Sequence, residues 1–329
     1  MSVFDTRHYY KPFQYPEFYA RYVEHDAAHW RPEEVPLLDD IRDWRNRMTQ
    51  EEKDFITQVF RFFTQADVDV AGAYATEFLP MFKLPEIRMM LLDFGAREAT
   101  HVRAYSHLID TLGMPEVTYR QFLEYGQMKA KHDYYMLHMD EEAETPRSVA
   151  KKLAIFGGFT EGMQLFSSFI MLLNQSRVEN GGKMKGMSQL VTWSILDETM
   201  HTEGNIGLFR QIISENPEIW DDKFKGEIYQ VARDMVDLED GFIDLAYGDG
   251  AAHSNLAKAD VKKYIRYIAN RRLNQLGLKD NWEEVTENPL PWVEEMINAP
   301  ILTNFFENRS TDYAKAALTG SWEDVFREI

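Results

Sequence analysis

A four-residue pattern, Glu-x-x-His, occurs twice in this chain, as Glu98-Ala-Thr-His101 and as Glu198-Thr-Met-His201. Residues three positions apart share one face of an α-helix, so each copy can offer an oxygen and a nitrogen to one metal ion. The two copies fall in different segments that we predict to be long helices. The repeated pattern therefore predicts a helical protein with two metal-binding helices.

Two further carboxylates complete the pattern that a two-metal site in a four-helix bundle needs. Asp67 lies in the segment before Glu98, and Glu161 lies in the segment before Glu198, each among apolar residues. One Glu-x-x-His alone is more often a solvated helix face or a capped core histidine. A carboxylate in an apolar core, however, needs a partner to offset its desolvation. Two copies in this order predict a dinuclear metal site.

Tyr105 follows His101 by four residues and Glu98 by seven. It should therefore lie on the same helix face as these two residues, one turn beyond the metal. A buried helical tyrosine most often serves only the packing of the core. At this position a redox-active metal could also oxidise it.

Helix signals dominate the chain, and alternating runs typical of strands are scarce, so we predict an all-α fold. Thr49 and Glu52 form a capping box, and Gly113 is placed to end a helix. We expect long helices over about residues 50–78, 85–112, 146–177 and 188–213. At 1.5 Å per residue, 25 to 32 residues extend roughly 38 to 48 Å, the scale of a long antiparallel bundle.

The stretch from Leu153 to Leu173 is long and apolar enough to resemble a membrane span. It carries Glu161 and Gln164, and a carboxylate at the centre of a bilayer costs roughly 3 kcal/mol. We therefore expect a buried helix. The Gly157-Gly158 pair just before Glu161 weakens that helix and favours a π-type distortion.

Composition excludes several kinds of site and partner. The formal net charge is -18, which repels phosphate backbones and anionic lipid, so we expect no binding to nucleic acid or membranes. The chain has no cysteine, so any metal must be held by Asp, Glu and His. Met1–Tyr10 lacks the apolar segment of a signal peptide, and we expect a cytoplasmic protein.

No composition break divides the 329 residues into domains of ordinary size. After Ala299-Pro300 the chain becomes polar and loses its helical period. We therefore predict one helical domain over residues 1–300 and a C-terminal tail over residues 301–329 that docks elsewhere.

These features together resemble the small (β) subunit of class I ribonucleotide reductase, from about Trp30 to Tyr313. The matching motifs are HWRPEEV at His29–Val35, REATHVRAY at Arg97–Tyr105 and LDETMH at Leu196–His201. The resemblance implies a ferritin-like bundle. It also implies that one metal is bound by Asp67, Glu98 and His101 and the other by Glu161, Glu198 and His201, with Glu98 bridging.

The same resemblance implies roles for residues beyond the metal ligands. Tyr105 matches the tyrosine that stores a radical in many members of the family. Trp30 and Asp197 match the pair that, with the histidine at His101, begins the electron path towards the partner. Tyr313 matches the tail tyrosine that relays the radical across the subunit interface. Leu165 departs from the phenylalanine of some members, which leaves the metal and oxidant open and the ligand set unchanged.

The resemblance implies a large (α) subunit as partner, which would carry the cysteines that this chain lacks, and a homodimer of this chain. Two iron ions are the expected metals, with dioxygen or a reduced oxygen species for activation, although carboxylate and imidazole ligands also accept manganese. Two alternatives are a ferritin-like di-metal oxidase or oxygenase, including the ligand-binding oxidases that resemble this family, and an iron-storage protein. The oxidases lack the full set of Trp30, Tyr105, Asp197 and Tyr313, and storage cages use shorter chains.

Overall fold

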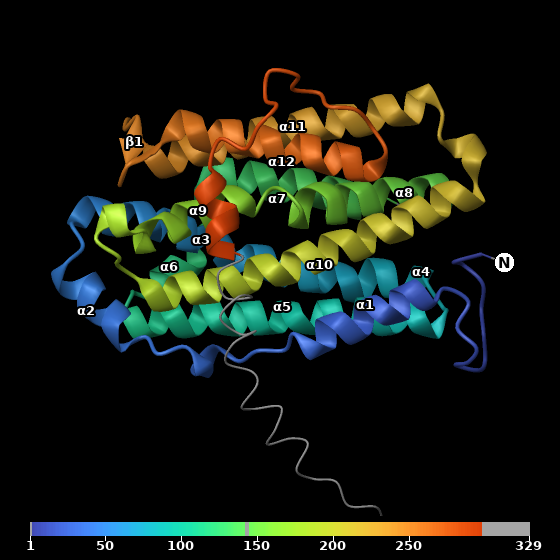
Figure 1. Cartoon of the computed structure of the whole chain (residues 1–329), viewed down its shortest axis with the longest axis horizontal. Coiled ribbons are helices and arrows are strands. Elements are labelled where there is room, and N and C mark those ends of the chain that lie inside the picture. Colours follow the sequence, from blue (N-terminus) through green and yellow to red (C-terminus); the bar gives the residue numbers. More distant parts are fainter. Residues whose placement is uncertain (1, 142–144, 298–329) are drawn as a thin grey trace, which may run out of the picture. The chain divides into compact units, whose positions relative to one another are not determined.

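The computed structural model describes residues 2–141 and 145–297, which are mostly helical (Figure 1). The all-α prediction is confirmed. Within the described residues, the strands are β1 (Ala252–His253) and β2 (Leu256–Ala257), which pair in antiparallel register with His253 opposite Leu256. The described chain divides into two units after Pro289. The first unit holds the elements described below, and residues 291–297 of the second are helical.

Four helical stretches carry the residues that the sequence singled out. They are α3 (Gln50–Ala73), α5 (Pro85–Leu112), a segmented stretch from Pro146 to Leu173, and α10 (Lys185–Glu215). Helix α3 packs along α5, and α10 packs against the middle of the segmented stretch and against α5. The two Glu-x-x-His helices, α5 and α10, therefore lie in one bundle with the helices of Asp67 and Glu161.

Local signals explain where these helices begin and end. The Thr49 hydroxyl accepts a hydrogen bond from the Glu52 backbone N–H at 3.2 Å, and the Glu52 carboxylate accepts one from the Thr49 N–H at 2.9 Å. This confirms the predicted capping box. Helix α5 ends at Gly113, whose φ of +74° lies in the left-handed region that glycine favours.

Helix α10 begins three residues earlier than predicted because carboxylates from α2 (Leu38–Asn46) cap its first turn. Asp43 accepts from the Met184 N–H at 2.9 Å. Asp40 accepts from the N–H groups of Gly186 and Met187 at 2.9 and 2.7 Å. The side chains thus satisfy N–H groups that have no partner within the helix.

The predicted helix over residues 146–177 is in fact three segments. Helix α8 (Pro146–Leu153) continues into the π-helical segment η4 (Ala154–Glu161), and after a turn over residues 162–165 the chain forms α9 (Phe166–Leu173). The π-type distortion expected around Gly157-Gly158 is confirmed. A second π-helical segment, η2 (Tyr74–Phe78), was not predicted, and it leads into the short helix α4 (Leu79–Met81). The chain therefore stays helical past Pro80.

Further helices surround this bundle. Helix α1 (Pro16–Ala27) packs on α5, while α11 (Asp222–Tyr247) and α12 (Lys258–Leu276) pack on each other, and α7 (Gly126–Met139) packs on α11. Short helical turns make the connections: η1 (Pro32–Glu34), α6 (Val117–Arg120), η3 (Phe122–Glu124), η5 (Asn174–Ser176), η6 (Val178–Asn180) and η7 (Pro217–Ile219).

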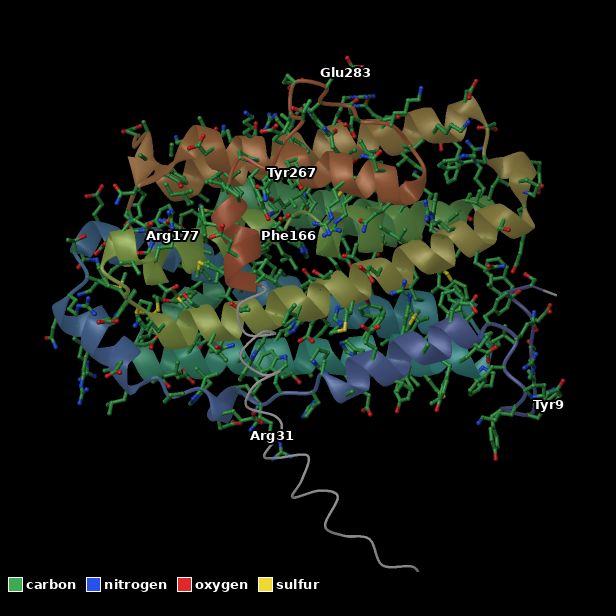
Figure 2. The ribbon with its side chains drawn as sticks, in the orientation of Figure 1. Tyr9, Arg31, Phe166, Arg177, Tyr267 and Glu283 are labelled. Atoms are coloured by element: carbon green, nitrogen blue, oxygen red, sulfur yellow. The ribbon has the colours of Figure 1, made fainter. Side chains whose placement is uncertain are left out.

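Side chains fill the space between these helices (Figure 2). The apolar stretch Leu153–Leu173 lies in this core, with Phe156, Phe159 and Ile170 fully buried. In the part of the chain that the structure describes, no helix combines the length and apolar character that a membrane crossing requires. The expectation of a buried helix is confirmed. The predicted tail over residues 301–329 lies outside the described residues.

Candidate metal centre

Six buried side chains from four helical stretches converge in the bundle. One oxygen each of Glu98, Glu161 and Glu198 and one ring nitrogen of His201 all lie within 4.8 Å of one another. Glu98 lies on α5, Glu161 ends η4, and Glu198 and His201 lie on α10. The other two, Asp67 and His101, are no more than 2% exposed.

Glu98 lies between the two imidazoles. His101 Nδ1 is 3.2 Å from Glu98 Oε2, and His201 Nδ1 is 3.0 Å from Glu98 Oε1. Glu198 also faces both rings, with Oε1 at 3.3 Å from His101 Nδ1 and Oε2 at 3.5 Å from His201 Nδ1. Glu161 Oε1 lies 3.5 Å from His201 Nδ1. The arrangement gives each histidine its own side of the cluster, with carboxylates between them.

The donor set fits two divalent cations. Four buried atoms of the cluster make no hydrogen bond: Asp67 Oδ2, Glu98 Oε1, Glu198 Oε2 and His201 Nδ1. Glu98 Oε1 and His201 Nδ1 are close, but their orientation does not make a hydrogen bond. A buried polar atom without a partner costs about 1–3 kcal/mol. Two divalent cations would satisfy these atoms and balance the negative charges of four carboxylates.

Burial and mutual charges shift the pKa values of the cluster side chains. Burial raises the pKa of Asp67 well above its usual range and the pKa of Glu161 to about 8. Burial alone would also raise the pKa of Glu98, but His101 and His201 outweigh it and lower that pKa to about 2. Burial opposes protonation of both histidines, yet the surrounding carboxylates raise their pKa values well above the usual range. Metal ions must therefore displace protons from this cluster.

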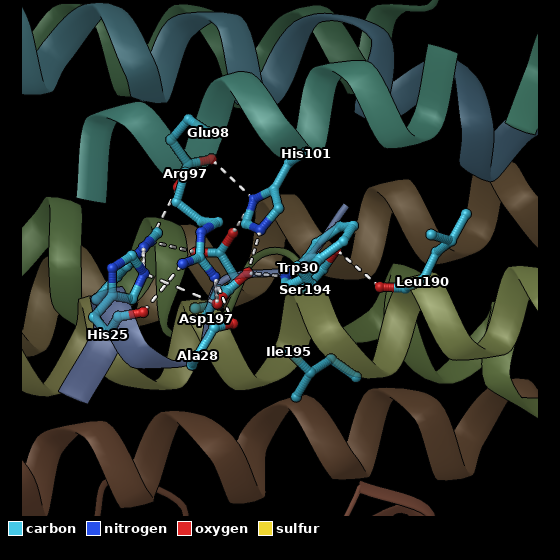
Figure 3. A network of polar contacts seen from close by, with 12 residues as sticks. His25, Ala28, Trp30, Arg97, Glu98, His101, Leu190, Ser194, Ile195 and Asp197 are labelled. Atoms are coloured by element: carbon cyan, nitrogen blue, oxygen red, sulfur yellow. Dashed lines mark hydrogen bonds and ion pairs between the residues drawn. The ribbon is translucent and has the colours of Figure 1, made fainter. Parts of the chain in front are cut away.

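Asp197 connects His101 to Trp30 (Figure 3). His101 Nε2 lies 3.0 Å from Asp197 Oδ2, and Trp30 Nε1 donates to the same oxygen at 2.7 Å. Arg97 donates to Asp197 Oδ1 at 2.5 Å. Burial would raise the pKa of Asp197, but His101 and then Arg97 hold it below its usual value. The structure thus brings together His101, Asp197 and Trp30, the three residues that the family resemblance linked.

The other histidine has a partner that the sequence analysis missed. His201 Nε2 lies 3.1 Å from His25 Nε2, and His25 Nδ1 lies 2.5 Å from Asp93 Oδ2. His25 is fully buried on α1, and burial lowers its pKa. It is 176 positions from His201 in the chain, so no local pattern could have paired them. Each Nδ1 therefore faces the cluster while each Nε2 has its own partner.

Tyr105 is 3% exposed, and its ring stacks on Phe63 with centroids 4.4 Å apart. Its hydroxyl donates to Ser194 Oγ at 3.2 Å rather than to a carboxylate of the cluster. Burial raises the pKa of Tyr105. Leu165 is buried in the turn that follows Glu161. Tyr313 lies outside the described residues.

Trp193 was also missed. Its ring lies 5.2 Å from that of Trp30, which is itself stacked near His101 at 6.0 Å. Trp193 lines a cavity of about 650 Å³ between α2 and the start of α10, together with Arg47 and Lys185. No sequence pattern predicts this pairing, because it depends on how α10 packs against the segment that carries Trp30.

A helical bundle with a buried cluster of Glu and His side chains is an architecture that suits a protein with a dinuclear metal site. Residues 7–289 match the family model of the ribonucleotide reductase small chain. The chain belongs to this family. It is a small subunit of ribonucleoside-diphosphate reductase, an oxidoreductase, and as such it pairs with a large subunit.

Two relatives and two solved structures illustrate the similarity. The chain is 47% identical to a probable ribonucleoside-diphosphate reductase small subunit of Invertebrate iridescent virus 6, covering 100% of this chain and 99% of the relative. It is 29% identical to the ribonucleoside-diphosphate reductase subunit β of Chlamydia pneumoniae, covering 93% of this chain and 89% of the relative. The ribonucleotide reductase R2 subunit from Clostridium botulinum has a TM-score of 0.82 at 20% identity, covering 90% and 94%. Streptococcus sanguinis dimanganese(II)-NrdF has a TM-score of 0.76 at 19% identity, covering 89% and 99%. These structural likenesses confirm the ferritin-like fold.

Proposed function

We propose that this chain binds two metal ions and produces the oxidising equivalent that its large subunit uses to reduce ribonucleotides. The ligands of one metal would be Asp67, Glu98 and His101, and those of the other Glu161, Glu198 and His201, with Glu98 bridging. The observation that carries this proposal is the placement of Glu98 between two imidazoles whose Nδ1 atoms both face it, at 3.2 and 3.0 Å.

The partners of the histidines support one way in which these rings would bind the metals. If Nδ1 is the ligand atom, Nε2 carries the proton and donates outward, from His101 to Asp197 and from His201 to His25. His25 then accepts at Nε2 and donates from Nδ1 to Asp93. When bound, the metal pair would supply one-electron oxidising power after reaction with dioxygen or a reduced oxygen species. Burial of the cluster keeps bulk water away from that chemistry.

We propose that Tyr105 stores the radical and that Trp30 and Asp197 begin the electron path outward. The continuous contact from His101 through Asp197 to Trp30 supports the electron path. The position of Tyr105, four residues after His101 on α5, supports its role as the radical store. Tyr313, in the tail over residues 301–329, would relay the radical across the interface, while the helical domain over residues 1–300 holds the metals. The tail proposal rests on sequence resemblance, since those residues lie outside the described part of the chain.

We propose iron as the resident metal, with manganese as the alternative that the same ligands accept. We further propose that the protein works as a homodimer in the cytoplasm and binds no nucleic acid. The net charge of -18 supports the last point because it repels phosphate backbones.

Metal analysis combined with EPR spectroscopy of the activated protein tests this function. About two iron or manganese ions per chain and a tyrosyl or mixed-valent metal signal are expected. Metal at trace levels after careful loading would refute the central proposal. Deleting residues 301–329 should leave metal and radical in place but end binding to the large subunit. Tyr313→Phe should keep binding and stop turnover.

A further inference from the structure

A second buried tyrosine contacts the cluster directly. Tyr74 is 1% exposed, and its hydroxyl lies 2.9 and 3.0 Å from the two carboxylate oxygens of Glu161. Asn205 on α10 donates to the Tyr74 hydroxyl at 2.9 Å and to Glu161 Oε2 at 2.9 Å. The three side chains form a closed triangle in which Tyr74 donates to Glu161 and accepts from Asn205.

The backbone is shaped around this triangle. The π-helical segment η2 begins at Tyr74, and the π-helical segment η4 ends at Glu161. Such distortions cost helix stability and are frequent at functional sites. A Cβ atom at position 157 would lie 2.2 Å from the Cβ of Asn205, so only glycine leaves room for this asparagine. Two π-turns and a glycine thus place Tyr74, Asn205 and Glu161 together.

Tyr74 has a closer link to the cluster than Tyr105 has. The Tyr105 hydroxyl donates to Ser194, which in turn donates to the backbone carbonyl of Leu190. Tyr74 instead donates to a carboxylate that we assign as a metal ligand. The Tyr74 ring lies among other rings, with centroids 4.9 Å from Phe156 and 6.0 Å from His201. A radical on Tyr74 would therefore be shielded from solvent.

We propose that Tyr74 is a second oxidisable tyrosine of this centre, a proposal that rests on the function proposed above. The oxidant is the dinuclear metal pair after its reaction with dioxygen or a reduced oxygen species. Tyr74 gives one electron to that pair, which is reduced by one electron. Metal binding ionises Glu161, so the phenolic proton can move along the existing hydrogen bond to this carboxylate, and the O–H bond is the bond that breaks. The phenoxyl oxygen keeps the hydrogen bond from Asn205.

The two tyrosines are linked to the cluster in different ways. The Tyr74 hydroxyl donates to the Glu161 carboxylate, whereas the Tyr105 hydroxyl donates to Ser194 Oγ. Oxidation of Tyr74 competes with that of Tyr105 and becomes the visible reaction when Tyr105 is absent.

The test compares activated proteins by rapid-freeze EPR spectroscopy at matched metal content, measured by elemental analysis. Tyr105→Phe is expected to keep a tyrosyl signal, and the Tyr105→Phe/Tyr74→Phe protein is expected to lose it. Tyr135 is the matched control, because it is buried at 5% exposure and donates to the Asp69 carbonyl instead of to a ligand. Tyr105→Phe/Tyr135→Phe should keep the signal of Tyr105→Phe.

Two results would overturn the proposal. One is a Tyr105→Phe protein with full metal content, oxidant consumption and no tyrosyl signal. The other is a tyrosyl signal that persists in the Tyr105→Phe/Tyr74→Phe protein, because the radical would then sit elsewhere. Failure of the underlying function looks different, since the unmodified protein itself would then bind no metal or consume no oxidant.

Discussion

Replacing Lys131 with methionine would leave the carboxyl group of Glu239 in the core without its cation. Lys131 Nζ lies 2.5 Å from Glu239 Oε2 and donates to the Gln164 carbonyl at 3.1 Å. It also lies 3.7 Å from the centre of the Phe62 ring. Lys131 is 3% exposed and Glu239 is fully buried. The other Glu239 oxygen accepts from the Ser167 hydroxyl, which cannot replace a cation.

Removing one partner of a buried ion pair lowers the free energy of unfolding by about 3–5 kcal/mol. At about 1.5 °C per kcal/mol for 329 residues, Lys131→Met should lower the melting temperature by about 4–7 °C. Replacing both partners avoids the unpaired charge. The Lys131→Met/Glu239→Gln protein keeps an acceptor for Ser167 and should recover to within about 2 kcal/mol of the unmodified protein.

The loss of stability caused by Lys131→Met should depend on pH. Burial raises the pKa of Glu239, while Lys131 opposes this, so removing Lys131 raises the pKa further. The folded variant then holds a proton that the unfolded chain releases above about pH 4.5. The stability that this proton contributes is fully present below that pH and is lost as the pH rises towards the folded pKa. The deficit against the unmodified protein should therefore be smaller at about pH 5 than at about pH 8.

Thermal unfolding of the metal-free proteins, followed by circular dichroism, measures these differences. Lys129→Met is the matched control, since Lys129 lies on the same helix and its ion pair with Asp133 is exposed, with side chains 53% and 54% accessible. That substitution should cost less than about 1 kcal/mol. The reasoning is refuted if Lys131→Met is no more costly than Lys129→Met, or if the Lys131→Met/Glu239→Gln protein is as unstable as Lys131→Met.

Three further outcomes are expected. Glu198→Ala should reduce the metal content from about two ions per chain to about one. Glu203→Ala, which changes a 44% exposed side chain on the same helix α10, should leave the metal content unchanged. If elemental analysis finds the same metal content in both variants, the ligand assignment is contradicted. Because burial raises the pKa of Glu161 to about 8, metal binding at about pH 7 should release protons. Calorimetry in buffers of different ionisation enthalpy measures this release, and finding no released protons would contradict the prediction. Asp40→Ala removes the acceptor at the start of α10 and should cost about 1–3 kcal/mol in thermal unfolding, so a loss below about 0.5 kcal/mol would count against capping.

The cluster could be predicted from the sequence because each half of it consists of residues close together in the chain. Glu98 and His101 are separated by three positions on one helix, as are Glu198 and His201, and this spacing is independent of the rest of the fold. Asp67 and Glu161 could be added because a carboxylate within an apolar segment needs a partner. The helix start at Thr49 and the end at Gly113 were equally local, and both are confirmed.

Most of the surroundings of the cluster could not be predicted in the same way. His25 reaches the cluster only through tertiary packing and belongs to no local pattern. Asn205 follows His201 by four positions on α10, the spacing that placed Tyr105 after His101, so this local signal could have found it. Tyr74 is seven positions after Asp67, a spacing that usually returns a residue to the same helix face, yet η2 changes the helix geometry from Tyr74 onward. The earlier start of α10 depends on Asp40, which lies 146 positions before Gly186. Long-range contacts of this kind set the chemistry of the site without a sequence signature.

The π-helical segment η4 also has an evolutionary consequence. In a π-helix the backbone hydrogen bonds join residues five positions apart instead of four, so the segment holds an extra residue compared with an α-helix. Glu161 closes η4, and Gln164 and Ser167, which pack near Lys131 and Glu239, follow within six positions. A one-residue deletion within residues 154–161 would let the segment close as an α-helix, which keeps these flanking residues in register but changes which side chains of η4 face the cluster. Lineages of this chain should therefore accumulate insertions and deletions in the connecting turns and almost never in η4, even where the residues of η4 themselves change.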